Sequence, residues 1–202
     1  MATKADSLLA DTYKTLKLDN QPASKLYAAI PEIVSHLAMV NAVERIHVGT
    51  TGTISERLCM LALESIRETN PSFEYRRFRQ DWKWIGDLLV PGDPYDLAIS
   101  VKSYKAKERL LASGTGSLLT PTVGWGLFDD TKEWSSNRTA SYLYRGFVAI
   151  YLPINTLVGV SPESKKITNI NGKALLRALD DFPTDLRAAI VTSTHRVDFR
   201  KI

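Results

Sequence analysis

Two charged side chains stand in apolar surroundings where surface charges are not expected. Asp87 interrupts one aliphatic run, and Lys102 ends the next. The turn-forming residues "PGDPYD" lie between the runs, so the two should pair as an antiparallel hairpin. Residues two apart on a strand share a face, which places Ser100 beside Lys102 and lets the hairpin bring Asp87 to both. Burying a charged side chain is unfavourable unless it is paired. The placement of an acid and a lysine in these apolar runs therefore indicates a structural or functional role for the pair.

The chain around this hairpin predicts an α/β fold with a mixed central sheet flanked by helices. A period of two indicates successive strands, and an almost wholly apolar run indicates a strand buried on both faces. The expected strands cover 73–80, 82–90, 97–104 and 146–154.

The most regular helical pattern before the hairpin covers 53–70. Thr53 and Glu56 have the spacing of a capping box at its start. Further helices are expected over 5–19, with Asp6 as the N-cap, and over 22–43. The short run before Thr53 is interpreted as a strand followed by a Gly/Thr loop.

The chain beyond the hairpin is expected to alternate loop, helix and strand. Residues 111–134 are rich in Gly, Thr and Ser and are interpreted as a ligand-contacting loop or lid. Helices are expected over 135–145 and 172–181, and a last strand over 188–199. We expect one domain over 1–202, comprising a helical region (1–45), a core (53–154) and a C-terminal helix and strand (155–202).

The string from Gly86-Asp87 to Ser100-Val101-Lys102 resembles the motif of the PD-(D/E)xK nuclease superfamily, in particular type II restriction endonucleases with an S-x-K variant. The resemblance covers residues 53–154. It implies a core of helix, three strands, helix and strand, and Mg²⁺-dependent hydrolysis of phosphodiester bonds. Carried over, Asp87 would be a metal ligand, and Lys102 would activate water and stabilise charge on the phosphoryl oxygens.

The chain departs from that motif at two positions. Gly86 replaces a proline, and Ser100 replaces the second acid, so a metal site would lack one ligand. Some S-x-K enzymes supply the missing carboxylate from a later glutamate, for which Glu108 is the nearby candidate. Glu56 on the preceding helix matches another place where the superfamily adds a glutamate.

Simpler interpretations exist for each of these residues. Asp87 and Lys102 could form a structural salt bridge, Glu56 could serve only the capping box, and Glu108 could form a surface ion pair. Asp96 shares a strand face with Lys102, but its place in "PGDPYD" favours capping of the turn.

Positive charge gathers on both sides of the hairpin and would suit phosphate contacts. The four tryptophans are expected to pack in the core or in loops, although Trp125 in the glycine-rich loop could contact DNA. The predicted DNA-binding residues are Arg76, Arg77, Arg79, Lys105, Lys107, Arg109 and Trp125.

Composition places few limits on function. The chain has 26 Lys and Arg against 22 Asp and Glu, a net charge of +4, which suits a polyanionic partner or an ordinary protein. Its single cysteine, Cys59, excludes a disulfide framework, and no apolar run has the length of a membrane helix. We expect a cytoplasmic protein without a membrane partner.

Two functional hypotheses follow. The first is a Mg²⁺-dependent, sequence-specific endonuclease for double-stranded DNA, which acts as a homodimer so that two subunits cut the two strands. The alternative is a catalytically inactive nuclease fold that serves as a DNA-binding module or a partner subunit. The two hypotheses differ in one structural feature: the endonuclease needs a carboxylate that replaces the acid missing at Ser100, and the inactive fold does not.

Overall fold

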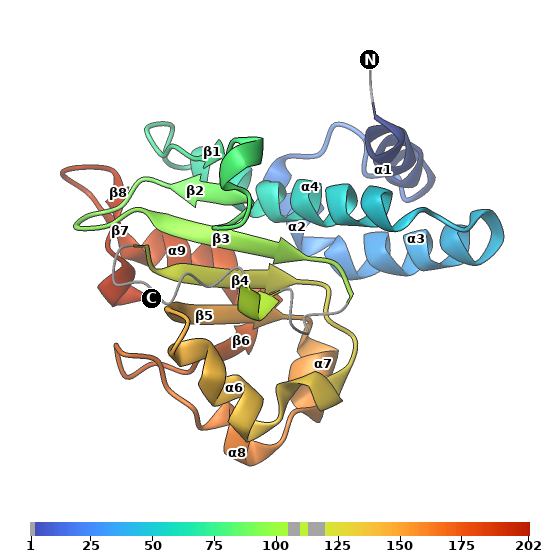
Figure 1. The fold of residues 1–202 in the computed structure, drawn as a ribbon. Helices are drawn as coiled ribbons and strands as arrows, with labels where there is room; N and C mark the ends of the chain where they lie inside the picture. The colour runs from blue at the N-terminus through green and yellow to red at the C-terminus, as the bar shows by residue number, and fades with distance from the viewer. Residues whose placement is uncertain (1–2, 105–109, 113–119) are drawn as a thin grey trace. The chain divides into compact units, whose positions relative to one another are not determined.

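The computed structural model describes residues 3–104, 110–112 and 120–202. The chain divides into two compact units, Met1–Pro71 and Ser72–Ile202. In the described residues the first unit is wholly helical and the second contains all the strands (Figure 1). The expectation of one domain over the whole chain stays a prediction.

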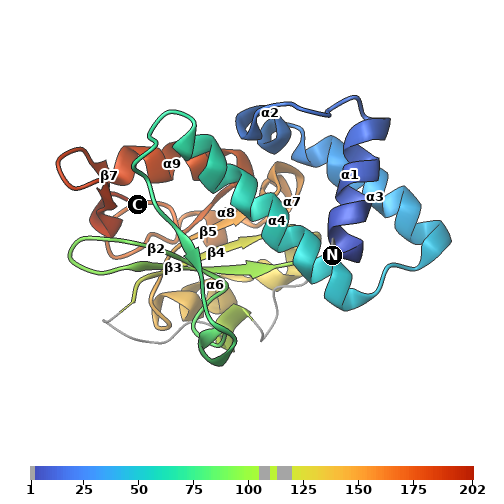
Figure 2. The ribbon, with the colours of Figure 1, turned by 90° about the horizontal axis from the view of Figure 1, so that it is seen from above.

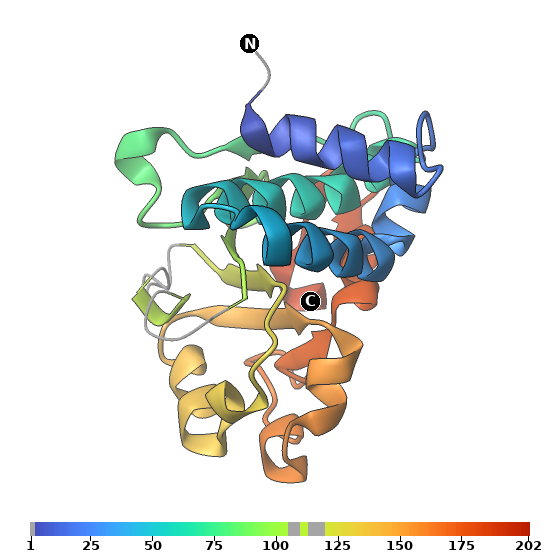
Figure 3. The same ribbon diagram turned by 90° about the vertical axis from the view of Figure 1, so that its right-hand side faces the viewer.

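Four helices build the first unit. α1 contacts α3 and α4, and α2 contacts α4; these helices are blue to cyan in Figure 3. Their bounds are α1 (Lys4–Thr15), α2 (Ala23–Ala28), α3 (Ile30–Glu44) and α4 (Val48–Arg67).

The cap of α1 is Thr3, three residues before the expected Asp6. The Thr3 hydroxyl accepts a hydrogen bond from Asp6 N, and the Asp6 carboxylate accepts one from Thr3 N, which completes a capping box. Asp6 also accepts a hydrogen bond from Arg57 Nε at 2.9 Å, so it joins α1 to α4.

The start of α4 corrects the predicted helix boundary. The helix begins at Val48, where His47 Nδ1 accepts a hydrogen bond from Gly49 N. Thr53 lies inside the helix and its hydroxyl donates to Gly49 O, so the predicted capping box of Thr53 and Glu56 is wrong. The predicted strand before it is wrong as well, because helical hydrogen bonding prevails over the β-branched and glycine residues.

A mixed six-stranded sheet forms the centre of the second unit, which confirms the predicted α/β class. The strands follow one another in chain order; β1, β2 and β3 are antiparallel, whereas β3 to β6 are parallel (Figure 1). They are β1 (Arg76–Arg77), β2 (Leu88–Val90), β3 (Leu97–Lys102), β4 (Thr122–Gly126), β5 (Phe147–Leu152) and β6 (Leu176–Ala178).

Helices cover the two faces of this sheet, as Figure 2 shows for α6 and α9. The α-helices of this unit are α6 (Ser136–Leu143), α7 (Ile154–Gly159), α8 (Pro162–Lys165) and α9 (Phe182–Ala189). Short 3-10 helices are η1 (Gln80–Trp82), η2 (Thr131–Trp134), η3 (Leu179–Asp181) and η4 (Phe199–Lys201). In the described chain, no helix combines the length and the apolar character that crossing a membrane requires.

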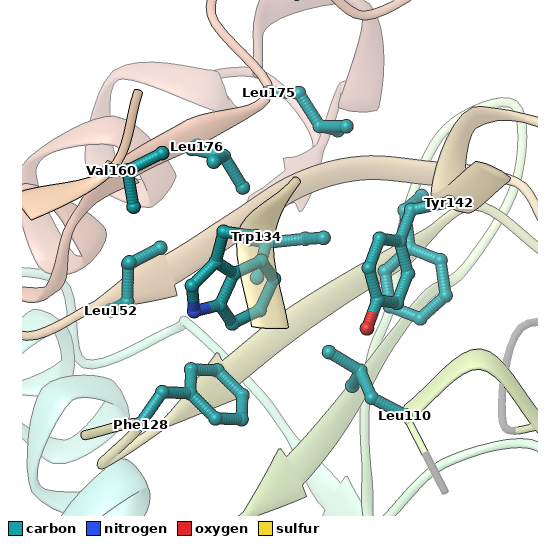
Figure 4. Close-up of a cluster of buried hydrophobic side chains, with 10 residues drawn as sticks. Leu110, Phe128, Trp134, Tyr142, Leu152, Val160, Leu175 and Leu176 are labelled. Atoms are coloured by element: carbon teal, nitrogen blue, oxygen red, sulfur yellow. The ribbon is translucent and has the colours of Figure 1, made fainter. Parts of the chain in front are cut away.

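The pairing of residues across β3 to β6 determines which side chains lie on each face of the sheet. Tyr151 of β5 faces α9, where its ring lies 4.9 Å from that of Phe182. The opposite face holds a buried cluster in which Trp134 of η2 lies between Leu152 and Tyr142 (Figure 4). The row on the α9 face is Val101, Trp125, Tyr151 and Arg177, and the row on the cluster face is Ser100, Gly124, Ile150 and Leu176.

Two regions of the second unit differ from the predictions. The expected loop over 111–134 contains β4, whose residues are all buried. The expected helix over 172–181 is β6 followed by η3, and the helix α9 comes after it. The expected last strand is a small hairpin of β7 (Ile190–Val191) and β8 (Arg196–Val197).

Candidate active site at the β2–β3 hairpin

The predicted hairpin is formed by β2 and β3. Leu88 pairs with Ile99, and Val90 with Leu97, in an antiparallel ladder. Asp96 closes the turn, since its carboxylate accepts a hydrogen bond from Gly92 N at 3.0 Å. Asp96 therefore lies at the opposite end of β3 from Lys102.

Asp87 lies at an irregularity just before β2. Its backbone N–H donates to Ile99 O at 2.8 Å, although Ile99 pairs with Leu88. Two residues of one arm thus face one residue of the other, the arrangement of a β-bulge, which redirects a side chain. A Cβ at Gly86 would lie 3.0 Å from Ile99 O, so the close approach favours glycine there.

The bulge brings Asp87, Ser100 and Lys102 together. Asp87 Oδ2 accepts a hydrogen bond from Val101 N at 2.7 Å and lies 3.4 Å from Lys102 Nζ. Lys102 Nζ also lies 2.8 Å from Ser100 Oγ and 3.0 Å from Val101 O. Three oxygen atoms of one hairpin therefore surround a single cationic nitrogen.

This group is partly desolvated but not sealed. Ser100 is fully buried, whereas the side chains of Lys102 and Asp87 retain 18% and 20% of their exposure. Partial burial strengthens the attraction between charges. The remaining exposure lets a ligand reach the charged atoms, so the group can act on a molecule that arrives from solvent.

The described residues supply part of a divalent-cation site. Within them, Asp87 Oδ1 accepts no hydrogen bond, and Ser100 and Val101 offer a hydroxyl and a carbonyl oxygen. No group of three His, Cys, Asp or Glu side chains that could hold a metal occurs in that part of the chain. Mg²⁺ is often held by one or two carboxylates with water and substrate phosphate completing the shell, so these ligands fit Mg²⁺ when a second acid joins Asp87.

The two candidates for that second acid are Glu56 and Glu108. Glu56 is half-buried on α4 and belongs to the first unit, whereas Asp87, Ser100 and Lys102 belong to the second. Glu108 lies outside the described residues.

Some of the basic residues predicted to bind DNA lie in the described part of the chain and others do not. Arg76, Arg77 and Arg79 are exposed on and after β1. Arg79 Nη2 lies 3.6 Å from Asp81 Oδ2, and Arg76 Nη2 lies 3.9 Å from Asp96 Oδ2. Both ion pairs are exposed to solvent, so they contribute little to the stability of the fold. The other predicted basic residues, Lys105, Lys107 and Arg109, lie outside the described part of the chain.

The tryptophans differ in exposure. Trp125 lies in β4 and is fully buried, so it cannot stack on DNA and the predicted contact is wrong. Trp82 and Trp84, expected to pack in the core or in loops, lie in the connection between β1 and β2 and are 51% and 62% exposed. The only signal in the sequence for this exposure is the cluster of charged residues around them.

Comparisons with protein-family models, with curated proteins and with solved structures give no match to this chain.

Proposed function

We propose that this chain is a cytoplasmic, Mg²⁺-dependent endonuclease that hydrolyses phosphodiester bonds of double-stranded DNA at specific sites, as type II restriction enzymes do. The proposal depends mainly on one observation: Asp87, Ser100 and Lys102 converge on adjacent arms of one hairpin, and the side chains of Asp87 and Lys102 keep 20% and 18% of their exposure. An acid that can bind a cation, beside a fixed cation, suits a phosphate diester better than an uncharged substrate.

Each residue of the group has a defined task in this proposal. Lys102 stabilises the negative charge that grows on the phosphoryl oxygens as water attacks phosphorus and the bond to the leaving sugar oxygen breaks. Asp87 Oδ2 and Ser100 Oγ fix the position of the ammonium group, because both accept its hydrogen bonds. The hydrogen bond from Val101 N holds the Asp87 carboxylate in place.

Asp87 Oδ1 and Val101 O would hold the metal ion, together with Glu56 or Glu108. A bound Mg²⁺ ion supplies Lewis-acid stabilisation of the phosphoryl oxygens and lowers the pKa of a water molecule. Ser100, at the position of the missing acid, would add a neutral oxygen.

The order of the elements also supports the proposal. α4 precedes β1, β2 and β3, a helical segment is present at residues 110–112, and β4 follows in parallel to β3. This is the order of helix, three strands, helix and strand that the resemblance implies. Its last strand is then β4 rather than the strand predicted over 146–154.

The DNA substrate and the homodimer are parts of the same proposal. Exposed arginines on and after β1 would contact phosphates on the β1 side of the hairpin. A single hydrolytic centre cuts one strand, so two copies related by a two-fold axis would cut both strands of a palindromic site.

Cleavage of supercoiled plasmid tests the proposal. Wild-type protein with Mg²⁺ should give discrete fragments, while Asp87→Ala and Lys102→Ala should give none and EDTA should stop the reaction. Equal cutting by all three proteins would indicate a contaminating nuclease and would remove the assignment.

Ser100 favours one second candidate function. With a hydroxyl in place of the second acid, the fold could bind DNA without cutting it, either alone or as a partner subunit. In that case wild-type protein would retard a DNA duplex in a gel, with or without Mg²⁺, and would cut no plasmid.

A further inference from the structure

Trp82 and Trp84 form an exposed aromatic pair next to the proposed active site. Their ring centroids lie 6.4 Å apart at an interplanar angle of 23°, and the side chains keep 51% and 62% of their exposure. Tryptophan is highly buried on average. Two stacked tryptophans left in solvent therefore indicate a surface that contacts another molecule.

The segment that carries the pair is anchored at its base. Phe78 N donates to Asp87 O at 3.1 Å, which closes the connection between β1 and β2. Within it, Trp82 N donates to Arg79 O and Ile85 N donates to Trp82 O, so the tryptophans stand on a structured turn. This segment is green at the upper left of Figure 3.

The charges of this segment identify the kind of partner. Residues 76–87 contain two acids, Asp81 and Asp87, and four cationic residues, Arg76, Arg77, Arg79 and Lys83. Exposed tryptophans interleaved with cations match the surfaces on which proteins stack nucleic-acid bases while holding the backbone phosphates.

Distance along the chain links the pair to the proposed chemistry. Trp84 is three residues from Asp87, a separation that an extended chain spans in at most about 11 Å. Along B-DNA this is about three base-pair steps of 3.4 Å. A base near the scissile phosphate is therefore within reach of the rings.

We propose that Trp82 and Trp84 stack on bases of the DNA close to the cleavage position. This inference rests on the proposed endonuclease function and adds to it the residues that contact bases. Because every base has a π-face, the contact tolerates any sequence and contributes affinity rather than selection of a site.

Binding without metal ions tests the inference separately from catalysis. The probes are a fluorescein-labelled random-sequence duplex and one of its single strands, titrated with protein in EDTA while anisotropy is followed. The double variant Trp82→Ala/Trp84→Ala should bind the single strand roughly 10-fold more weakly and the duplex by a smaller factor, because neighbouring base pairs cover the base faces of a duplex. The slope of log affinity against log salt should stay unchanged. Trp82→Phe/Trp84→Phe should recover most of the affinity.

Two control variants separate stacking from other effects. Tyr144 is an 84% exposed aromatic residue at the end of α6, and Tyr144→Ala should bind as wild type does. Arg79→Gln should lower the salt slope by about one, as expected for a lost phosphate contact.

Several results would overturn the inference. Unchanged affinity of the alanine double variant would do so, and so would wild-type protein that binds neither probe. A wild-type dimer that becomes a monomer in the double variant, observed by sedimentation, would make the pair a contact between copies of the chain. Absence of plasmid cleavage, with weaker binding of the double variant in EDTA, would remove the endonuclease proposal and leave the stacking role intact.

Discussion

Two ion pairs of the second unit, Lys102–Asp87 and Arg177–Asp185, are alike in composition and different in setting. Each joins a cation on a parallel strand to a nearby carboxylate. Around Arg177 the partners come from several elements: Tyr151 of β5, Asp185 of α9 and Ala174 O before β6. Around Lys102 the hydrogen bonds to Asp87, Ser100 and Val101 all stay within one hairpin.

The chemistry of the Arg177 group is that of a structural connection. Tyr151 donates to Asp185 Oδ2 at 2.7 Å, and Arg177 lies over the Tyr151 ring at 5.9 Å from its centroid. Burial raises the pKa of Tyr151 well above its usual value, so the phenol stays a donor to Asp185. The Arg177 side chain is only 9% exposed. This group fixes α9 to the sheet and leaves little access for a ligand.

The contrast shows how a charged pair can be assigned to stability or to chemistry. A cation enclosed by partners from several elements holds those elements together. A cation bound within a single hairpin joins no separate elements, and the 18% exposure of Lys102 gives a ligand access to its side chain. Mutations at the two pairs should therefore have opposite effects on cleavage and on stability.

The largest expected effect is on cleavage. Lys102→Met should lower the rate of plasmid cleavage by about 100- to 1000-fold, as expected when a fixed charge at the transition state is lost. The free energy of unfolding should fall by about 1 to 2 kcal/mol, because the side chains of the pair are partly buried, at 18% and 20% exposure, but connect only the arms of one hairpin. Cleavage kinetics and urea unfolding measure the two quantities.

The exposed Lys132 provides the matched control, and Lys132→Met should change neither quantity. If Lys102→Met unfolds the protein while leaving cleavage per folded molecule intact, the two pairs have the same structural role and the contrast fails.

The next effect is on stability. Arg177→Met should lower the free energy of unfolding by about 3 kcal/mol, because it leaves Asp185 and Tyr151 without their cation. The exposure of Asp185, 30%, keeps this loss at the lower end for a broken buried pair. Urea titration followed by circular dichroism measures it.

Tyr151→Phe offers a milder variant of the same group, expected to lose about 1 kcal/mol. In both variants cleavage per folded molecule should match wild type. Arg187→Met, on the exposed side of α9, serves as the control. A loss of cleavage larger than the loss of folded protein would show that the Arg177 group contributes to catalysis.

A substitution at Ser100 tests whether the Lys102–Asp87 group binds a metal ion. Ser100→Asp would place a second carboxylate beside Lys102, and the midpoint of Mg²⁺ activation should fall about 10-fold, because carboxylate count tunes divalent-cation affinity. Ser103→Asp adds the same charge just beyond β3 and should leave the midpoint unchanged. An unchanged midpoint in Ser100→Asp would indicate that Glu56 or Glu108 already supplies the acid.

The hairpin could be predicted from the sequence because two aliphatic runs flank an unambiguous turn, and the period of two then places Asp87, Ser100 and Lys102 together. β4 could not, because Gly124 and Gly126 are typical of a loop. In the fold a Cβ at Gly126 would lie 2.7 Å from Lys102 O, so close packing of the strands is what requires glycine there.

Exposure was the property that the sequence predicted least well. The alternation around Trp82 and Trp84 is typical of a strand, but the chain forms the short helix η1 and turns both rings outward. Helical propensity likewise failed over 172–181, where pairing with β5 makes β6 a strand. The pairing of β6 with β5 is a contact between distant segments, which short-range patterns do not contain.

The smallest predicted effect concerns a third ion pair, Asp6–Arg57, which lies within the first unit. The pKa of Asp6 is lowered from 3.8 to about 2, chiefly by hydrogen bonds from Thr3 and then by Arg57. A lowered pKa means that the carboxylate stabilises the fold above pH 3.8 and that this stabilisation is lost as the pH falls toward 2. Asp6→Asn should therefore show a smaller drop than wild type in the urea midpoint over this interval. Asp11→Asn, at an exposed acid of the same helix, should follow wild type, and identical curves for Asp6→Asn and wild type would show that α1 does not depend on this charge.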